Sequence, residues 1–478
     1  MLKVLYVASE AVPFMKVGGL ADVAFSLPRE LRKLGIDIRV IIPKYKGILK
    51  KFKSKMAYVT KFMVPVGWEK QKCKIEYLEY EGVPFYFIDE EYYFHRDGIY
   101  GFYDDEERFS YFCKGVLGTI ENLDFKPHII HCNDWHSGMI CPLLKEYKRD
   151  NPKFSNIKTM FTIHNLKYQG IYDKKILRSL LNLGMEYYND DAIKLYDGVS
   201  FMKAGINYAD VVTTVSKTYA KEIQNPSYGE GLDGPLRKRK DNLYGIVNGV
   251  DYQIYDPNKD DNIFAKYNIN SLGNKVENKV NLQKLLNLPQ NKEVPVVAMV
   301  SRLTYAKGIK LLIPILDELL AKDIQMVILG TGDREIESRI KDFAHKYPEK
   351  LSANILFHEN LAHKIYASSD MFLMPSLREP CGLSQLIALK YGSIPIVRST
   401  GGLKDTVNPY CESTGEGNGF TFIDCNGDEI LNTINMALKF YEDKNMWKKI
   451  ITNAMGSDYS WKNSTIEYKK LYESLVKG

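Results

Sequence analysis

Residues 3–34, KVLYVASEAVPFMKVGGLADVAFSLPRELRKL, decide the fold class of this chain. The apolar run at 3–8 predicts a buried strand, and apolar residues with helical spacing follow over 20–34. Between them stands the glycine pair Gly18-Gly19, which lets the backbone approach a ligand closely and direct free N–H groups toward an anion. A strand, a glycine turn and a helix in this order are typical of parallel α/β domains.

The same alternation of short apolar runs and helical patterns continues along the chain in two series. The first series of predicted strands comprises 3–8, 37–42, 128–132, 159–163 and 211–215. The second comprises 295–300, 325–329, 354–357, 371–374 and 394–397, with predicted helices at 309–320, 384–391 and 430–441. We therefore expect an α/β fold of two Rossmann-like, doubly wound parallel-sheet domains that divide near 241–250. The polar, asparagine-rich segment 258–280 is expected to be a surface excursion.

The composition argues against several classes of protein. The 478 residues include 65 basic and 59 acidic side chains, a net charge of +6 without the clustered basic surface of a nucleic-acid binder. No stretch approaches the roughly 20 apolar residues that a membrane helix needs. The seven cysteines are widely spaced and form no C-x-x-C, which argues against a disulfide framework and a structural zinc site. A reducing cytoplasm is the expected location.

Unusual polar residues follow the strands of the first series, where ligands of open parallel sheets bind. Lys16 provides a point charge suited to a phosphate, and Asp22 can accept hydrogen bonds from sugar hydroxyl groups. Asp134 and the pair His164-Asn165 follow two further strands and are able to hydrogen-bond a substrate. The alternative is an ordinary glycine-capped turn, with polar side chains that satisfy local backbone groups.

Four polar or glycine-rich loops follow the strands of the second series. Arg302 and Lys307 lie in one loop before a helix, an arrangement that predicts a two-point clamp for a diphosphate. The other loops are Gly330-Thr331-Gly332-Asp333, Glu379-Pro380-Cys381-Gly382-Leu383 and Thr400-Gly401-Gly402. Each loop alone has a simple explanation as a turn or helix cap, but four in one domain favour a phosphate and sugar site.

Two motifs that resemble known sites fail on their spacing. Glu335 stands where a nicotinamide fingerprint requires the third glycine after Gly330 and Gly332. His358 and His363 resemble part of a zinc-protease motif, but a spacing of five residues places them on different faces of a helix.

A metal-dependent site is also disfavoured. No Asp-x-Asp triplet occurs in the chain, and no carboxylate–histidine spacing accompanies His128, His131 and His136, for which ordinary strand-flanking roles are the better explanation. We expect neither a metal nor a cofactor. The charge on a leaving phosphate would then be met by lysine, arginine and helix N-termini.

In this order along the chain, the motifs resemble the bacterial and plant glycogen and starch synthases, glycosyltransferase family 5. The resemblance spans almost the whole chain, and it rests on Ser9-Glu10, 16–23, Asp134-Trp135-His136, His164-Asn165, 248–251, 301–303, Lys307-Gly308, 379–383, 400–406 and 459–461. The patterns Lys-x-Gly-Gly-Leu and Glu-Pro-Cys-Gly-Leu are its most specific parts.

The resemblance implies the two-domain GT-B fold, with the domains facing a central cleft. The N-terminal acceptor and catalytic domain would comprise 1–243 and a returning C-terminal helix, 457–478, and the nucleotide-sugar-binding domain 244–456. It also implies transfer of glucose from ADP-glucose to the non-reducing end of glycogen or another α-1,4-glucan, with retention of the α configuration. Nucleic acid and membranes are not expected partners.

The family pattern further implies a role for each matching residue. Five groups would hold the ADP diphosphate: Lys16, Gly18, Gly19, Arg302 and Lys307. The transferred glucose would lie against Glu379, Cys381, Gly382 and Leu383, with Asp134, His164 and Asn165 on the glucose and acceptor side. Asp22 and Asn248 would lie in the cleft, and Thr400, Gly401 and Gly402 near the phosphate or sugar. The adenine would rest near Phe357, where family members often have tyrosine, and His358 replaces the family's usual acid.

Two other functions fit less well. The first is a GT-B enzyme that uses UDP-glucose or another acceptor. The second is a glucan-binding protein that has lost catalysis, although the intact set of Lys16, Arg302, Lys307 and Glu379 argues against it.

Overall fold

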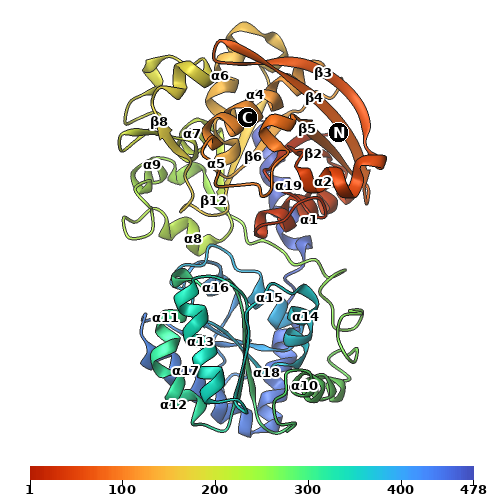
Figure 1. Cartoon of the computed structure of the whole chain (residues 1–478), viewed down its shortest axis with the longest axis vertical. Coiled ribbons are helices and arrows are strands. Elements are labelled where there is room, and N and C mark those ends of the chain that lie inside the picture. The colour runs from red at the N-terminus through yellow and green to blue at the C-terminus, as the bar shows by residue number, and fades with distance from the viewer. Residues whose placement is uncertain (478) are drawn as a thin grey trace. The chain divides into compact units, whose positions relative to one another are not determined.

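The computed structural model describes residues 1–477, apart from the side chains of 49–51 and 53. The chain folds into two compact units (Figure 1). The first unit comprises Met1–Val247 and the residues from Trp461 onward, and the second comprises Asn248–Ser460. Each unit contains a largely parallel sheet covered by helices, which confirms the prediction of two parallel-sheet α/β domains.

A nine-stranded sheet with the order β12-β11-β7-β6-β1-β2-β5-β4-β3 forms the centre of the first unit. Its strands are β1 (Lys3–Val7), β2 (Asp37–Pro43), β3 (Ala57–Val66), β4 (Glu69–Tyr80), β5 (Val83–Asp89), β6 (Ile129–Asn133), β7 (Lys158–Ile163), β11 (Val211–Thr214) and β12 (Leu243–Gly245). The pairs β3–β4 and β4–β5 are antiparallel, and the other neighbours are parallel. A separate small sheet contains β8 (Ile171–Asp173), β9 (Lys194–Leu195) and β10 (Gly198–Ser200).

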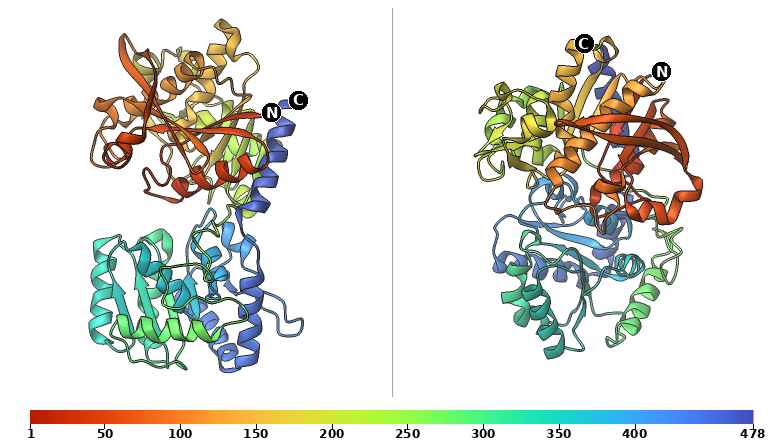
Figure 2. Two further views of the ribbon diagram at one scale, coloured as in Figure 1. Left: turned by 90° about the vertical axis from the view of Figure 1, so that its right-hand side faces the viewer. Right: turned by 45° about the horizontal axis from the view of Figure 1, so that its top comes forward.

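The helices of the first unit include one from the far end of the sequence. They are α1 (Gly19–Lys33), α2 (Lys46–Phe52), α3 (Glu91–Phe94), α4 (Asp105–Asn122), α5 (Trp135–Gly138), α6 (Ile140–Asp150), α7 (Phe201–Tyr208), α8 (Lys217–Glu222), α9 (Asp233–Lys238) and α19 (Trp461–Lys477). Trp461, Tyr468 and Tyr472 of α19 belong to the apolar core of this unit. The Tyr472 hydroxyl lies 2.6 Å from His131 Nδ1, so α19 is anchored on β6. Figure 2 shows this C-terminal helix, in blue, beside the elements of the first unit.

The second unit has a six-stranded parallel sheet with the order β15-β14-β13-β16-β17-β18. Its strands are β13 (Val296–Val300), β14 (Gln325–Leu329), β15 (Leu351–Asn354), β16 (Met371–Met374), β17 (Ile394–Arg398) and β18 (Phe420–Phe422). Its helices are α10 (Gly273–Leu285), α11 (Ile309–Leu312), α12 (Leu316–Leu320), α13 (Arg334–Lys346), α14 (Glu359–Ser368), α15 (Ser384–Lys390), α16 (Gly401–Thr406), α17 (Gly427–Glu442) and α18 (Lys444–Gly456).

Both faces of this second sheet are buried. Val297 and Met299 of β13 pack in one apolar cluster with α17 and α18, whereas Val296 and Ala298 pack in another with α14 and α15. A strand that is covered on both sides needs apolar residues at every position, not at alternate ones. This explains why continuous apolar runs in the sequence predicted these strands well.

Two predicted elements differ from the structure. The strand expected at 354–357 lies earlier, at Leu351–Asn354, because its pairing with β14 ends where Leu329 meets Asn354. The helix expected at 309–320 is divided into α11 and α12 by a 3₁₀ turn, Ile313–Ile315. Pro314 in this turn lacks the N–H that a continuous helix requires.

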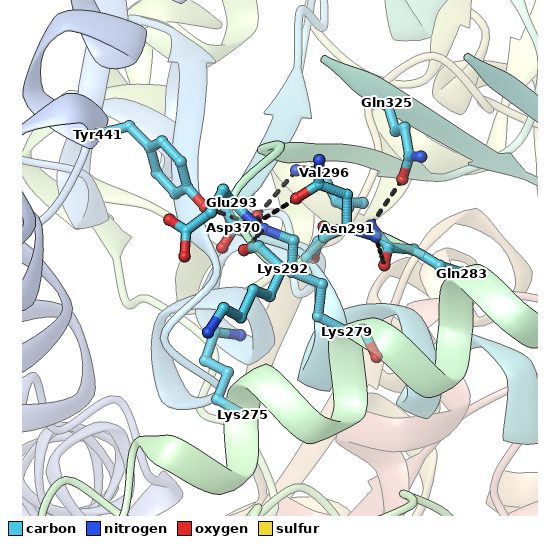
Figure 3. Close-up of polar contacts among 12 residues, drawn as sticks. Lys275, Lys279, Gln283, Asn291, Lys292, Glu293, Val296, Gln325, Asp370 and Tyr441 are labelled. Carbon is cyan, nitrogen blue, oxygen red and sulfur yellow. Dashed lines mark hydrogen bonds and ion pairs between the residues drawn. The ribbon is translucent and has the colours of Figure 1, made fainter. Parts of the chain in front are cut away.

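The expectation of a surface excursion at 258–280 is wrong, because α10 begins at Gly273 and buries polar side chains (Figure 3). Lys279 Nζ lies 2.7 Å from Asp370 and donates to the carbonyl group of Lys292 at 3.0 Å and to the Tyr441 hydroxyl at 2.9 Å. A buried lysine needs such partners, since an unpaired buried charge is very costly. The lysine and asparagine residues therefore give α10 the composition of a solvated surface, although those on its buried face are hydrogen-bonded inside the protein.

Candidate functional site

The predicted site residues follow neighbouring strands in each unit. In the first unit, β1, β6 and β7 are adjacent, so the loop before α1, Asp134 and the pair His164-Asn165 leave the same edge of the sheet. In the second unit, β13, β16 and β17 are adjacent, and they are followed by the loops of Arg302, Glu379 and Thr400. The two sets are described separately.

Glu10 occupies the centre of the loop that precedes α1. Its side chain is buried, and Oε2 accepts hydrogen bonds from the backbone N–H groups of Val17 at 2.5 Å and Gly18 at 3.2 Å. Burial raises the pKa of this carboxyl group to about 7, although the two N–H groups oppose the shift. Glu10 was not among the predicted site residues, and the available signal was its position two residues after the predicted first strand.

The side chains of Lys16 and Asp22 lie together at the start of α1. Lys16 Nζ is 2.8 Å from Asp22 Oδ1, and both side chains are about one-third exposed, at 33% and 29%. The two residues were predicted to contact different parts of the ligand, but in this structure each is the other's ion-pair partner. Gly18 is the N-cap of α1 and provides no side-chain cap, which leaves the first N–H groups of the helix without an intrahelical acceptor.

Asp134, His164 and Asn165 form one hydrogen-bonded group. Asp134 Oδ1 accepts from the backbone N–H groups of His164 at 2.8 Å and Asn165 at 3.3 Å. Burial raises the pKa of Asp134 to about 7 and lowers that of His164 to about 3, so His164 is neutral. His164 Nε2 lies 2.8 Å from Asn133 Oδ1. Asp134 has a φ of 53°, a conformation that is uncommon for a residue with a side chain and is concentrated at functional sites.

Tyr100 contacts Ser9 and His136 in the same unit, and it was not among the predicted site residues. Its hydroxyl lies 2.7 Å from Ser9 Oγ, and its ring stacks on His136 with a centroid distance of 4.5 Å. Arg108, whose side chain is fully buried, donates to the carbonyl group of Tyr93 in α3 and to that of Ile99, the residue before Tyr100. Gly98 and Gly101 flank Tyr100 with φ values of 95° and 85°, and this pair of glycines is the sequence signal that could have identified the loop.

Lys307 and Glu379 form the polar centre of the second set. Lys307 Nζ lies 2.5 Å from Glu379 Oε2, and the Ser376 hydroxyl donates to the same oxygen at 2.9 Å. The Glu379 side chain is 8% exposed and that of Lys307 is 20% exposed. A buried carboxylate is thereby neutralised by a lysine that still reaches the surface.

Glycines allow the loops around Glu379 to pack against one another. Gly308 has a φ of 74°, and a Cβ atom there would lie 1.8 Å from the carbonyl oxygen of Pro375. A Cβ atom at Gly401 would lie 2.0 Å from the carbonyl oxygen of Glu379. Gly402 donates its N–H to that same carbonyl group at 3.1 Å. The glycines are required because the backbones approach too closely for any side chain.

Gln385 holds the loop Cys381-Gly382-Leu383 from inside the protein. Its Nε2 donates to the carbonyl oxygens of Cys381 at 3.0 Å and Gly382 at 2.9 Å, and the side chain is fully buried. These contacts satisfy the carbonyl side of the loop. Burial raises the pKa of the Cys381 thiol to about 12, which makes it a poor nucleophile.

The remaining predicted residues differ in their exposure and contacts. The side chain of Arg302 is exposed and has no hydrogen bond or ion pair within residues 1–477. Phe357 follows the edge strand β15 and is 83% exposed. Asn248 is buried, and its Oδ1 has no hydrogen-bond partner in the described part of the chain. Thr400 is the N-cap of α16, and His358 accepts the Leu361 N–H at 3.0 Å as the N-cap of α14.

Comparisons with known proteins agree with this arrangement. A family model described as the starch synthase catalytic domain matches residues 3–238, and one for group 1 glycosyl transferases matches residues 284–454. The glycogen synthase of Desulforamulus reducens is 52% identical over 475 residues, which cover 99% of each chain. That of Caldicellulosiruptor bescii is 54% identical over 476 residues, or 99% of this chain and 100% of the relative. This chain belongs to the glycogen synthase family.

Solved structures support the same family fold. The catalytic domain of starch synthase IV from Arabidopsis thaliana, solved with ADP and acarbose bound, has a TM-score of 0.93 and 32% identity, and the match covers 100% of both chains. Sucrose-phosphate synthase from Thermosynechococcus elongatus, at 15% identity and a TM-score of 0.62, shares the fold alone. The predicted GT-B fold and glycogen synthase function are confirmed. None of the helices within residues 1–477 is long and apolar enough to cross a membrane.

Proposed function

We propose that the chain transfers the glucosyl group of ADP-glucose to the 4-hydroxyl group at the non-reducing end of an α-1,4-glucan, with retention of the α configuration. The ADP bound to the Arabidopsis relative supports an adenine nucleotide as the donor. The chain has a phosphate-type loop before α1, another after β13, and the buried Glu379 carboxylate paired with Lys307. A binding protein without catalysis does not need this set. A cytoplasmic location is proposed because all seven cysteines are free thiols.

The pairing of Lys307 with buried Glu379 carries this proposal. In the proposed site, Lys307 and Arg302 contact the diphosphate, and Glu379 accepts hydrogen bonds from the transferred glucose. The N–H side of Cys381-Gly382-Leu383 faces the same sugar, since Gln385 holds the carbonyl side. Thr400, Gly401 and Gly402 lie near the phosphate or sugar, and Phe357 lies near the adenine.

The first unit supplies the acceptor side in this proposal. Asp134, His164 and Asn165 line the glucose and acceptor, and neutral His164 can donate or accept a hydrogen bond without a change of charge. Lys16 and the backbone of Gly18-Gly19 approach the diphosphate. Asp22 and Asn248 complete the site. The functional division we propose, 1–243 with 457–478 and then 244–456, lies within a few residues of the two structural units.

The proposed reaction breaks the bond between glucose C1 and the ADP oxygen and forms a bond from C1 to the acceptor O4 on the same face of the sugar. The acceptor proton passes to the departing phosphate. Asp134 is held by two backbone N–H groups and Glu379 by Lys307 and Ser376, which suits both carboxylates to binding rather than to covalent attack. Catalysis then comes from positioning and from cations placed where charge develops.

Transfer of radiolabelled glucose onto glycogen tests the proposal. We expect incorporation from ADP-glucose, and products that remain sensitive to an α-1,4-specific hydrolase. Preferred turnover of UDP-glucose would identify the chain as the alternative GT-B enzyme, with UDP-glucose as its donor. Binding of glycogen without transfer from either donor would indicate a non-catalytic glucan-binding protein.

A further inference from the structure

An internal carboxylate occupies the backbone N–H groups that begin the predicted phosphate loop. Glu10 Oε2 accepts from Val17 and Gly18, and Gly18 is the N-cap of the fifteen-residue helix α1. The side chain is buried, with the whole residue 3% exposed. A carboxylate at a helix N-terminus is favoured by the helix dipole, as a phosphate would be. Glu10 and a bound diphosphate would therefore both lie at the positively polarised N-terminus of α1.

The surroundings of Glu10 are rich in acidic groups. The charge of Asp22 on α1 raises the pKa of Glu10. The charge of Glu10 in turn raises the pKa of Asp134, the residue that follows β6. Two hydroxyl groups approach the Glu10 carboxyl group, that of Tyr100 from the loop before α4 and that of Tyr45 from the loop after β2. His136 on α5 is neutral because burial lowers its pKa. Lys16 is the cation at this end of α1, and it is paired with Asp22.

We propose that donor binding is coupled to uptake of one proton by Glu10, which keeps the loop before α1 in place in both states. This inference rests on the proposed function, because it places the diphosphate of ADP-glucose at the start of α1. The added phosphate charge disfavours a second anion beside it, so the carboxylate takes a proton from solvent and no other bond changes. The neutral carboxyl group still accepts the Val17 and Gly18 N–H groups through its carbonyl oxygen. Glu10 is thus a positioning residue.

Calorimetric titration of the full chain with ADP-glucose, without acceptor, tests this coupling between pH 6 and 8.5. ADP-glucose is the probe because its diphosphate diester does not titrate in this range, whereas free ADP does. A pKa of about 7 in the free protein, raised to about 9 or above in the complex, predicts roughly tenfold weaker affinity at pH 8 than at pH 6. Titrations in HEPES and Tris, which differ in ionisation enthalpy and add no phosphate that competes for the site, should show uptake approaching one proton at pH 8.

Two variants identify the group that takes the proton. Glu10→Gln imitates the protonated side chain, so its affinity should be independent of pH and its proton uptake should vanish. Asp134→Asn is the companion variant, since Asp134 is a second buried carboxyl group whose pKa is raised to about 7. Asp134 lines the glucose in the proposed site, so the affinity of this variant for ADP-glucose should fall at every pH. It should keep the slope and the proton uptake. A role of Glu10 limited to structure would lower affinity in Glu10→Gln at every pH without removing the slope.

The outcomes separate this inference from the proposed function. ADP-glucose that binds the wild-type protein without proton uptake overturns the coupling and leaves the donor in place. The same holds when Glu10→Gln retains the wild-type slope, or when Asp134→Asn loses it. Failure of ADP-glucose to bind at any pH overturns the proposed function together with the coupling. Should Glu10→Gln not fold, the wild-type uptake and the Asp134→Asn control decide the question.

Discussion

Substitution of the two cations of the second unit by alanine should reduce activity equally but reduce stability unequally. In Lys307→Ala, buried Glu379 keeps the Ser376 hydroxyl and loses the ammonium group at 2.5 Å. Removal of one partner from a fully buried pair costs roughly 3–5 kcal/mol. Lys307 is 20% exposed, so water reaches the carboxylate and we expect a cost of about 1–2 kcal/mol. Arg302 is exposed and unpaired among the described residues, so Arg302→Ala should change stability by less than about 0.5 kcal/mol.

The catalytic cost should be similar for both variants. Each removes a cation that contacts the departing diphosphate in the proposed site, and loss of one such contact typically lowers kcat by roughly 10²–10³. Transfer of labelled glucose from ADP-glucose to glycogen measures kcat. Thermal unfolding measures stability, and about 1–2 kcal/mol should lower the melting temperature of the second unit by roughly 2–8 °C.

A double variant is the matched control for the ion pair. Lys307→Ala combined with Glu379→Gln removes the unpaired charge, so it should recover most of the lost melting temperature without recovering kcat. An unchanged melting temperature in Lys307→Ala would refute the stabilising pair. A near-wild-type kcat in Arg302→Ala would show that this guanidinium does not contact the diphosphate.

Three further predictions concern other parts of the chain. Gln385→Glu places a carboxylate against the carbonyl oxygens of Cys381 and Gly382, so kcat/KM for ADP-glucose should fall about tenfold or more, and an unchanged value would contradict its positioning role. Burial lowers the pKa of Lys275 to about 7, so the unfolded state binds more protons above pH 7 and stability should rise by at most ~1.4 kcal/mol per pH unit between pH 7 and 9. Urea unfolding of Lys275→Met should lose this rise, and retention of the full slope would assign it to another group. Transfer activity should persist in excess EDTA, and a loss reversed by Mg²⁺ or Mn²⁺ would disprove a metal-independent reaction.

The sequence predicted the candidate site best for residues whose place is fixed by the direction of the parallel strands. Lys16, Asp134, His164 and Lys307 were selected because each follows a predicted strand, and parallel strands bring their carboxyl ends to one edge of a sheet. That inference needs no side-chain coordinates. It could not show that Lys307 pairs with Glu379, because the two residues lie in separate loops and only β13 and β16 packing side by side brings them together.

The errors arose where local composition conflicts with tertiary packing. The lysines and asparagines of α10 have the composition of a solvated surface, and they become interior only because Asp370, Tyr441 and backbone carbonyl groups satisfy them. The hairpin β3–β4 was not predicted, since its exposed face carries lysine and glutamate and its apolar face alternates. For α10, the deciding partners Asp370 and Tyr441 lie far away in the sequence.

By itself, the sequence determined the α/β class, the order of strands and helices along the chain, and the family, because these depend on local periodicity and on motifs of a few residues. Only the tertiary structure decided the charge state and partners of the candidate residues. Burial by distant segments raises the pKa values of Glu10 and Asp134 and lowers that of His164. A pKa depends on the solvent and charges that surround a group in space. The residues near Glu10 in the sequence do not determine those surroundings, because Asp134, Tyr100 and Tyr45 reach it only when the sheet has formed.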